Sequence, residues 1–560
     1  MRILASTLAL TLAACASTPS PTTQNGSTAA GIHVAVPAIE RPSGETPQWW
    51  YRSGAAHAAG NGAMAGRAKN VIVFLGDGMS LTTVAAARIF EGQRAGKPGE
   101  EHRLSWEDFP YTAFSRTYNT DAQTPDSAGT MTAVATGIKT HMGAIGVSAG
   151  KRRDCADSRG KHVQSWLQLA DNAGMATGIV TTARLTHATP AATYAHSPDR
   201  NWESDADMPS HARDAGCMDI ASQFIEATRD GRGPRVVLAG GAGRFLPDEE
   251  VLPGIRGKRK DGRNLVDEWQ QAHPDGAFVY STAQFEAART APSVLGLFEL
   301  SHMQYEHDRD KGAEGEPDLE TMTRFAIEKL ARDDAGYVLL VEGGRIDHGN
   351  HEGNAYRALD ETSSLSRAVA AAAQMTSAED TLIVVTADHS HTLNLVGYPR
   401  RGNPILGKVR GRGSEDDDPN EYARDALGLP FTTLVYANGP GYTGASSSQP
   451  AGPKRHLHEP KRFEPATGRP DLTHVDTEAP DYMQEALVPS SSESHGGDDV
   501  GIWARGPGSH AFRGNLEQNV IYHVIVQATP RLRETLCAQG LCDGNGVPVE
   551  LPKVDATKPR

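Results

Sequence analysis

Residues 337–351 read YVLLVEGGRIDHGNH, and this stretch decides the fold. The apolar run Tyr337–Val341 suits a strand buried on both faces, because no polar side chain alternates with the apolar ones. Glu342 follows at the strand end, while Asp347 and His351 lie one helical turn apart, share a face and can hold one ion. Glycines, histidines and carboxylates directly after a buried strand favour a metal site over a solvated helix start.

Other apolar runs repeat this pattern along the chain. They are rich in Val, Ile and Leu, and they are Asn70–Leu75, Thr177–Thr182, Arg235–Ala239 and Thr381–Thr386. Amphipathic stretches between such runs, for example 219–228 and 321–331, supply crossover helices. We therefore predict an α/β fold, a three-layer sandwich whose mostly parallel central sheet is flanked by helices, with ligands at the carboxyl ends of the strands.

Acidic residues follow two more of these runs. Asp77 lies in a Gly-Asp-Gly turn after the first run, and Asp388 and His389 follow Thr381–Thr386. Flanking glycines let the backbone turn and leave a carboxylate free to bind metal. A single Gly-Asp-Gly stretch is usually only a turn, but the recurrence of acids at several strand ends favours a metal site.

Two further residues are informative only in combination with these acids. Ser127, in the sequence DSAGT of residues 126–130, is predicted to begin a helix, where free N–H groups and the helix dipole favour a phosphoryl group. An ordinary N-terminal capping serine is the alternative. His495, in the sequence SHGG of residues 494–497, is by itself typical of a surface histidine.

The composition limits the class of partner. The 560 residues include 69 acidic and 55 basic ones, so the formal net charge is −14, and 38% are hydrophobic, which suffices for a large core. No basic block could follow a phosphate backbone, so we expect no nucleic acid as a specific partner.

The N-terminus is typical of an exported protein. Residues 1–16 contain an apolar run, Ile3–Ala14, that is too short to span a bilayer, which takes about 20 residues. Cys15 follows, as in bacterial lipoprotein signals, and we expect a lipid anchor there; cleavage after Ala16 is the alternative. Both readings export the protein to the periplasm or the cell surface. Residues 17–46, rich in Ser, Thr, Pro and Gly, are then expected to form a flexible tether.

Four cysteines remain once Cys15 is set aside. They are Cys155, Cys217, Cys537 and Cys542. An even number in an exported chain favours pairing over buried free thiols. Of the three possible connectivities, proximity favours Cys537 with Cys542, which leaves Cys155 for Cys217.

Residues 398–489 interrupt the α/β pattern. They are rich in Gly, Pro, Arg and Asp and contain one clear apolar run, 431–437. We interpret them as an insertion that serves as a lid, an interface or a partly disordered surface. The insertion would lie within a catalytic domain of residues 47–545, followed by a C-terminal tail, 546–560.

Acids at three strand ends, a serine at a helix start and a late histidine occur in this order in the alkaline phosphatases. The chain resembles that family from about Trp49 to Cys542, and most closely its animal-type branch, through the stretches THATP (186–190), YAH (194–196) and RNWESDAD (200–207). The resemblance implies hydrolysis of small phosphate monoesters through a phosphoserine on Ser127, with Arg200 as the phosphate clamp. It also implies a homodimer, a crown region at residues 398–489, and the same cysteine pairs.

The resemblance further implies a set of metal ligands for two zinc ions and one magnesium ion. The first zinc ion would be held by Asp347, His351 and His495. The second would be held by Asp77, Asp388 and His389, and the magnesium ion by Asp77, Glu342 and Thr189. Imidazole with carboxylate suits zinc, while an all-oxygen set suits magnesium.

Two positions depart from the best-known bacterial enzymes and agree with the animal-type ones. His187 and His348 stand where those bacterial enzymes have an Asp and a Lys. Both are expected near the magnesium ion, where they would adjust its affinity without binding it directly.

The animal-type resemblance extends to a calcium site. The carbonyl of Phe298 and the side chains of Glu299 and Glu316 match its ligands, with Glu316 in place of an Asp. Glu249 or Glu250 would be a fourth ligand, and ordinary surface acids are the alternative.

Related metalloenzymes with the same fold cleave sulfate esters, phosphodiesters or phosphonates. A sulfatase needs a modified Cys or Ser in a Cys/Ser-x-Pro-x-Arg motif, and the residues after Ser127 lack both the Pro and the Arg. Diesterases usually place a Thr at the nucleophile, so Ser127 and Arg200 favour monoesters, with a phosphodiesterase or phosphonate hydrolase as the alternative. A non-catalytic lipoprotein that binds metal or phosphate would have no need of Ser127.

Overall fold

A computed structural model of the chain describes residues 31–252, 255–411, 421–552 and 554. The predicted signal segment 1–16 with Cys15, and residues 17–30 of the predicted tether, lie outside these ranges. Within the described part, no helix is both long and apolar enough to cross a membrane.

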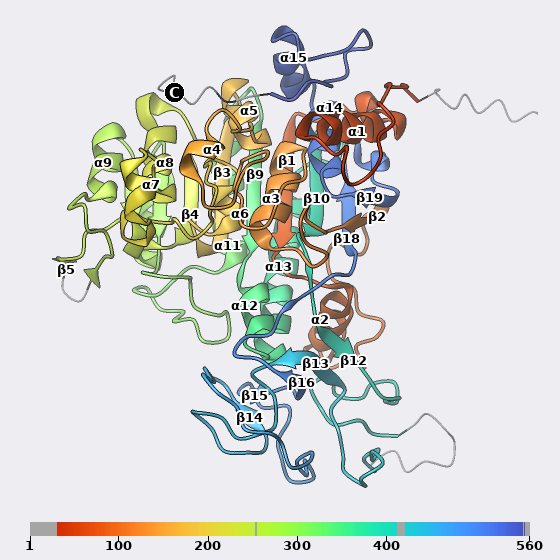
Figure 1. Cartoon of the computed structure of the whole chain (residues 1–560). Coiled ribbons are helices and arrows are strands. Elements are labelled where there is room, and N and C mark those ends of the chain that lie inside the picture. The colour runs from red at the N-terminus through yellow and green to blue at the C-terminus, as the bar shows by residue number, and fades with distance from the viewer. Residues whose placement is uncertain (1–30, 253–254, 412–420, 553, 555–560) are drawn as a thin grey trace, which may run out of the picture. The chain divides into compact units, whose positions relative to one another are not determined.

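The core of the protein is a ten-stranded sheet with the strand order β19-β2-β18-β10-β1-β9-β3-β4-β8-β7 (Figure 1). The parallel strands at its centre and on one side are β1 (Asn70–Gly76), β3 (Ala176–Arg184), β4 (Val236–Gly240), β7 (Ala277–Val279), β8 (Val294–Leu297), β9 (Tyr337–Gly343) and β10 (Thr381–Ala387). The other side holds β2 (Tyr111–Arg116), β18 (Val500–Arg505) and β19 (Gly514–Glu517), of which β18 is antiparallel to both of its neighbours. The predicted mostly parallel sheet is confirmed.

Helices cover both faces of the sheet, as predicted for three layers. The side chains of β1 alternate between two separate cores: Val71 and Val73 enter one, Ile72 and Phe74 the other. The first core is closed by α1 (Pro47–Gly60), α3 (Ser127–Thr136), α5 (Trp166–Asn172), α8 (Ile220–Ala227), α9 (Leu265–Ala272), α14 (Val520–Ala528) and α15 (Pro530–Ala538). The second core is closed by α2 (Leu81–Arg94), α11 (Leu319–Leu330) and α13 (Ala355–Met375).

The register of the three central strands brings their carboxyl ends level. Gly76 of β1 pairs with Gly343 of β9 on one side and with Ala387 of β10 on the other. Asp77 and Asp388 therefore leave the sheet side by side, one residue beyond the paired positions, and Glu342 lies one residue before them.

The structure differs from the sequence prediction at both ends of the domain. Val34, which the prediction places in the tether, is only 7% exposed and packs in one small core with Ala55 and Ala59 of α1. Val547 and Val549, which it places in the tail, complete that core. The scattered apolar residues of these polar segments bury against α1, a tertiary effect that composition does not reveal.

The crown insertion, residues 398–489, builds small sheets of its own. β13 (Leu434–Gly439) pairs with β12 (Leu393–Leu395) and with β16 (Ala486–Pro489), and β14 (Lys454–Arg455) pairs with β15 (Tyr482–Met483). The predicted apolar run, 431–437, overlaps β13 from Leu434 onward, while residues 412–420 lie outside the described part.

Both predicted disulfides are present. One joins Cys155 to Cys217 and the other joins Cys537 to Cys542.

Candidate metal centre and nucleophile

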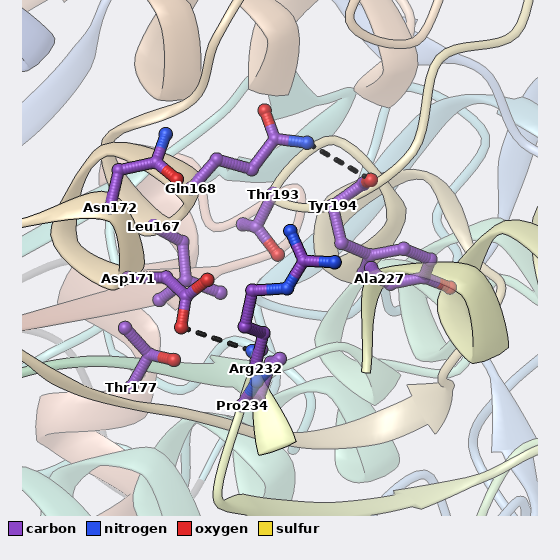
Figure 2. Close-up of a pocket in the computed structure, with 11 residues that line it drawn as sticks. Leu167, Gln168, Asp171, Asn172, Thr177, Thr193, Tyr194, Ala227, Arg232 and Pro234 are labelled. Atoms are coloured by element: carbon purple, nitrogen blue, oxygen red, sulfur yellow. Dashed lines mark hydrogen bonds between the residues drawn. The ribbon is translucent and has the colours of Figure 1, made fainter. Parts of the chain in front are cut away.

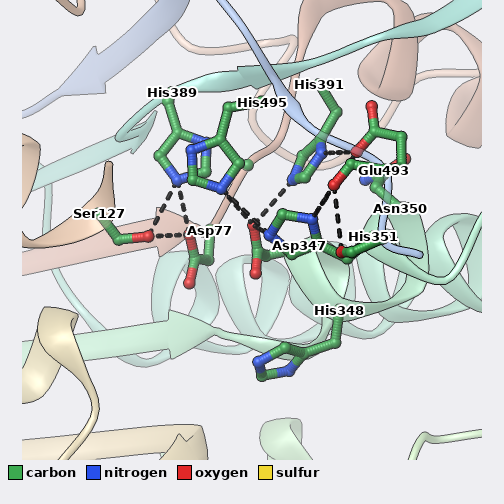
Figure 3. A network of polar contacts seen from close by, with 12 residues as sticks. Asp77, Ser127, Asp347, His348, Asn350, His351, His389, His391, Glu493 and His495 are labelled. Atoms are coloured by element: carbon green, nitrogen blue, oxygen red, sulfur yellow. Dashed lines mark hydrogen bonds and ion pairs between the residues drawn. The ribbon is translucent and has the colours of Figure 1, made fainter. Parts of the chain in front are cut away.

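Ser127 begins α3, as the sequence predicts, and it is 2% exposed. Asp126 caps the helix, because its Oδ1 accepts a hydrogen bond from the backbone N–H of Gly129 at 3.1 Å. The Ser127 hydroxyl lies 2.9 Å from Nε2 of His389 and 3.4 Å from Oδ1 of Asp77 (Figure 3). The structure thus brings the predicted nucleophile to the ends of β1 and β10.

Three clusters of acids and histidines surround this serine. The first cluster is Asp347, His351, His391 and His495; the second is Asp77, Asp388 and His389; the third is Asp77, His187 and Glu342. In each cluster the potential ligand atoms all lie within 4.8 Å of one another. All six zinc ligands and the two magnesium carboxylates expected from sequence are therefore found in these clusters.

The first cluster gathers three imidazoles around Oδ1 of Asp347 (Figure 3). The Nε2 atoms of His391, His351 and His495 lie 2.8, 3.4 and 3.5 Å from that oxygen. The Nε2 atoms of His351 and His495 are only 3.1 Å apart. Two ring nitrogens that face each other and a carboxylate at this range need a shared cation, since nitrogen lone pairs repel one another.

The second cluster is fixed by hydrogen bonds to Asp388. Its Oδ1 accepts from the backbone N–H of Gly78 at 3.1 Å and of His389 at 3.0 Å, and its Oδ2 accepts from the Thr130 hydroxyl at 3.1 Å. Nε2 of His389 lies 3.4 Å from Oδ2 of Asp388 and 3.4 Å from Oδ1 of Asp77. Two carboxylates and one imidazole form a donor set that suits zinc.

The third cluster contains buried polar atoms without a partner. Within the described residues, no hydrogen bond is made by Oδ2 of Asp77, Nδ1 of His187, Oγ1 of Thr189 or Oε1 of Glu342. The other Glu342 oxygen accepts a hydrogen bond from the Thr181 hydroxyl. Unpaired buried polar atoms are costly, and the three oxygens fit a cation that prefers oxygen.

The electrostatics of the site also favour bound cations. Burial, and then the charges of Asp388, Asp347 and Glu342, raise the pKa of Asp77 well above its ordinary value. Burial raises the pKa of Glu342 to about 8. Burial acts in the same direction on Asp347, but the imidazoles around it, His351 first, hold its pKa well below the ordinary value. Carboxylates this crowded are stabilised as anions by metal ions.

Arg200 lies beside the nucleophile and contacts the cap of its helix. Its Nη1 donates to Oδ2 of Asp126 at 3.1 Å, and its Nη2 donates to Nε2 of His187 at 3.1 Å. The backbone N–H of Arg200 donates to the carbonyl of Gly143 at 2.8 Å. The guanidinium is thereby held where it can reach an anion bound at Ser127.

The two additional histidines predicted near the third site take different places. His187 belongs to the third cluster, with Asp77 and Glu342. His348 belongs to no cluster in the described part; its Nδ1 contacts Arg345 at 3.0 Å, and its ring lies 4.1 Å from that of His302.

Sequence reasoning missed two residues of the first cluster's surroundings. His391 pairs with His495 in the small ladder of β11 (Ser390–His391) and β17 (His495–Gly496). Its spacing of two from His389 was an available signal, because alternate residues of an extended segment share a face. Glu493, which contacts His391, carried no signal in the sequence.

The predicted calcium ligands lie near one another without forming a complete cluster. Gln304 bridges two of them, because its amide Nε2 donates to Oε1 of Glu299 and its backbone N–H donates to Oε2 of Glu316, each at 2.9 Å. Burial raises the pKa of Glu316 to about 7, and its Oε1 has no partner among the described residues. Phe298 is buried beside them, and the side chain of Glu250 lies outside the described part.

A small pocket lies elsewhere, at the amino end of β3 (Figure 2). Thr177 and the Tyr194 backbone line it, and the Tyr194 carbonyl accepts a hydrogen bond from Gln168 at 3.1 Å. None of the predicted site residues lines this pocket. The three clusters at the opposite ends of the strands therefore define the candidate site.

Comparisons with known proteins agree with this geometry. The sequence profile of the family described as alkaline phosphatase matches residues 68–530. The tissue-nonspecific alkaline phosphatase of Gallus gallus is 43% identical over 473 residues, which cover 82% of this chain and 84% of that protein. The Homo sapiens counterpart is 42% identical over 473 residues, 82% of this chain and 83% of that protein. The solved structure of Thermus thermophilus alkaline phosphatase shares the fold, with a TM-score of 0.57 at 21% identity over 90% of this chain and 100% of that one.

Proposed function

The chain belongs to the alkaline phosphatase family, and we propose that it cleaves phosphate monoesters through a phosphoserine formed on Ser127. As a member of that family it is a metal-dependent phosphoric monoester hydrolase. The observation that carries the proposal is the position of Ser127, whose hydroxyl meets His389 and Asp77 at the first turn of α3.

Two zinc ions and one magnesium ion are the proposed cofactors. Asp347, His351 and His495 would hold the first zinc ion, Asp77, Asp388 and His389 the second, and Asp77, Glu342 and Thr189 the magnesium ion. The donor sets of the three clusters support this assignment. When bound, the ions would lower the pKa of hydroxyl groups bound to them and neutralise charge on the phosphate and the departing oxygen.

The residues of the chain would bind and transfer the phosphoryl group in two steps. Oγ of Ser127 attacks phosphorus, the bond to the ester oxygen breaks, and the alcohol leaves with a proton. Water then cleaves the new bond between Ser127 and phosphorus, which releases inorganic phosphate and restores the hydroxyl. The free N–H groups at the start of α3 and the fork of Arg200 would hold the phosphate oxygens throughout.

The test is hydrolysis of p-nitrophenyl phosphate across pH 7 to 11 by the wild type and by Ser127→Ala. We expect activity that chelation abolishes and zinc with magnesium restores, and a loss of about 10³-fold or more in the variant with unchanged metal content. Ser363→Ala is the matched control, because Ser363 is equally buried, at 2% exposed, and its hydroxyl lies in α13 without a hydrogen-bond partner in the described structure. A Ser127→Ala variant within tenfold of the wild type would exclude the phosphoserine.

We also propose export with a lipid anchor at Cys15. The two disulfides support an oxidising compartment. Fractionation of producing cells distinguishes the two predicted processing sites: the Cys15→Ser variant should leave the membrane fraction if Cys15 is lipidated. Wild-type protein that is already free of membranes would favour cleavage after Ala16.

A homodimer and a calcium site complete the proposal. Leu487 and Val488 on strand β16 of the crown insertion are 80% and 53% exposed, which supports a partner surface there, and light scattering would measure the mass. The unpaired Glu316 oxygen beside Glu299 supports calcium, and Glu316→Gln should lower the calcium content per chain.

A further inference from the structure

Glu493 is a fully buried carboxylate next to the first cluster. It lies two residues before His495, it is 1% exposed, and it is not a member of any of the three clusters. A buried carboxylate without an ion is costly unless it is fully hydrogen-bonded, so its partners identify its role.

The hydrogen-bond partners of the Glu493 carboxylate belong to the first cluster or to the residue beside it. Its Oε2 lies 2.5 Å from Nδ1 of His391, and its Oε1 accepts from the backbone N–H and the hydroxyl of Thr392 at 2.6 and 2.5 Å. Its backbone carbonyl lies 2.5 Å from Nδ1 of His351, and its N–H donates to the His351 carbonyl at 2.8 Å. One residue therefore holds two of the three imidazoles of the cluster.

These contacts decide which ring nitrogen faces the cluster. An imidazole that donates from Nδ1 presents Nε2 to the other side, and the Nε2 atoms of His391 and His351 both point toward Asp347. His495 follows the same rule, since its Nδ1 lies 2.7 Å from the carbonyl of Pro125. The Glu493 carboxylate thus orients His391, and backbone carbonyls, of Glu493 and Pro125, orient His351 and His495.

Glu493 packs closely against Gly439 on one side. A Cβ atom placed on Gly439 would lie 3.0 Å from Cβ of Glu493, and Gly439 has a φ of +133° that other residues rarely adopt. The pairing of His391 with His495 fixes the opposite side. A shortened or neutral side chain at 493 would therefore leave buried donors unpaired instead of rearranging.

We propose that Glu493 is a positioning residue whose carboxylate sets the metal affinity of the first cluster by orienting His391, while the backbone of residue 493 orients His351. The inference rests on the proposed binding of zinc by Asp347, His351 and His495. It holds whether Nε2 of His391 contacts the ion or Asp347, because the Nδ1 contact fixes the ring in both cases. Partners of this kind typically change metal affinity by about 10- to 100-fold when they are removed.

The decisive variant is Glu493→Gln, which keeps the shape of the side chain. A glutamine has one acceptor oxygen, so its NH₂ group must face a donor, either on His391 or on Thr392. Zinc affinity is measured on the metal-free chain by competition with a chelating dye. We expect one zinc ion per chain to bind about 10- to 100-fold more weakly and the other to bind as in the wild type.

A matched control separates positioning from a general loss of fold. Glu361→Gln makes the same change at another buried carboxylate, on α13, whose partner is the backbone N–H of Glu306. It should leave both zinc affinities unchanged. If Glu493→Gln fails to fold, Glu493→Asp provides the test, because it retains the charge and shortens the reach.

The visible spectrum of the cobalt-substituted protein gives a second readout, since it reports the geometry of imidazole ligands. We expect the spectrum of the first site to change in Glu493→Gln and to be preserved in Glu361→Gln. Unchanged zinc affinity and an unchanged cobalt spectrum in a folded Glu493→Gln variant would overturn the inference. If the wild type lacked phosphatase activity while the affinity still fell, the proposed function would fail and the positioning role would stand.

Discussion

The strand ends and the crown insertion contribute to the site in different ways. Asp77, Glu342 and Asp388 leave three adjacent parallel strands, and each is 0% exposed, so the backbone register itself places three carboxylates together. The described part of the crown insertion supplies no member of any cluster. The three carboxylates are therefore placed by the central strands of the sheet.

The crown insertion instead contacts the helix that carries two members of the first cluster. α12 (Arg345–His351) bears Asp347 and His351 and is followed at once by α13. Three side chains of the crown bond to this junction: Tyr436 to Asn350 at 2.8 Å, His456 to Glu352 at 2.7 Å, and Gln484 to the N–H of Ala355 at 2.6 Å. We therefore expect the sheet to place the carboxylates and the crown to influence how α12 presents Asp347 and His351.

The largest effect should come from a change at the strand ends. Asp77 belongs to two clusters, so Asp77→Asn removes charge from both at once. We expect kcat/KM to fall by at least about 10²- to 10³-fold, with less zinc and less magnesium per chain by elemental analysis. Loss of only one type of ion would contradict a bridging role for Asp77.

A residue at the other end of the same sheet, Asp333, provides the control for this change. Asp333 precedes β9 and pairs with Arg235 at 2.7 Å. Asp333→Asn should keep the metal content and the activity of the wild type, because a single ion pair at the protein surface contributes about 1 kcal/mol or less.

The stability of the protein should also depend on pH through the buried core, and His523 is the core residue that tests this dependence. It is fully buried in α14, its Nε2 lies 3.1 Å from the carbonyl of Gly137, and burial lowers its pKa to about 3. Because the unfolded chain takes up this proton near pH 6.5 and the folded one does not, stability falls as the pH drops from 6.5 toward 3. Between pH 7 and pH 5, the free energy of unfolding should fall by about 2 kcal/mol less in His523→Gln than in the wild type. The glutamine keeps a donor for the Gly137 carbonyl.

The measurement is urea unfolding of the metal-free protein at both pH values. Removing the metals keeps the protonation of their ligands the same in the two proteins, so the difference between them isolates His523. The same loss of stability in the variant and the wild type would show that His523 does not cause this part of the acid sensitivity.

The sequence predicted the parts of the fold that depend on local pattern. The buried strands Asn70–Gly76, Tyr337–Gly343 and Thr381–Ala387 lie where the apolar runs are, because both faces of a central strand must be apolar. The acids at their ends were visible for the same reason. Ser127 and His495 became interpretable only through their resemblance to a known family, since a capping serine and a lone histidine are common.

The residues that the sequence did not predict depend on contacts between distant segments. Glu493 reaches His391 across 102 positions of the chain, and no periodicity records such a contact. Val34 was assigned to a tether because its neighbours are polar, yet it is buried against Ala55 and Ala59. His187 lies in the third cluster because of the turn between β3 and α6 (Ala188–Ala191), whose geometry depends on tertiary packing.

The smallest effect should come from a change in the crown insertion. It tests directly whether the crown influences the clusters at the strand ends. Tyr436→Phe removes one hydroxyl and leaves the Asn350 oxygen on α12 without that donor, at a cost of about 1 kcal/mol. If the crown adjusts metal binding through α12, zinc affinity should fall about fivefold, with little change in the fold. Tyr442→Phe is the matched control, because its hydroxyl accepts from the N–H of Ala466 at 2.8 Å inside the crown. Equal zinc affinities in the two variants would mean that the crown supports α12 mechanically without influencing the metal site.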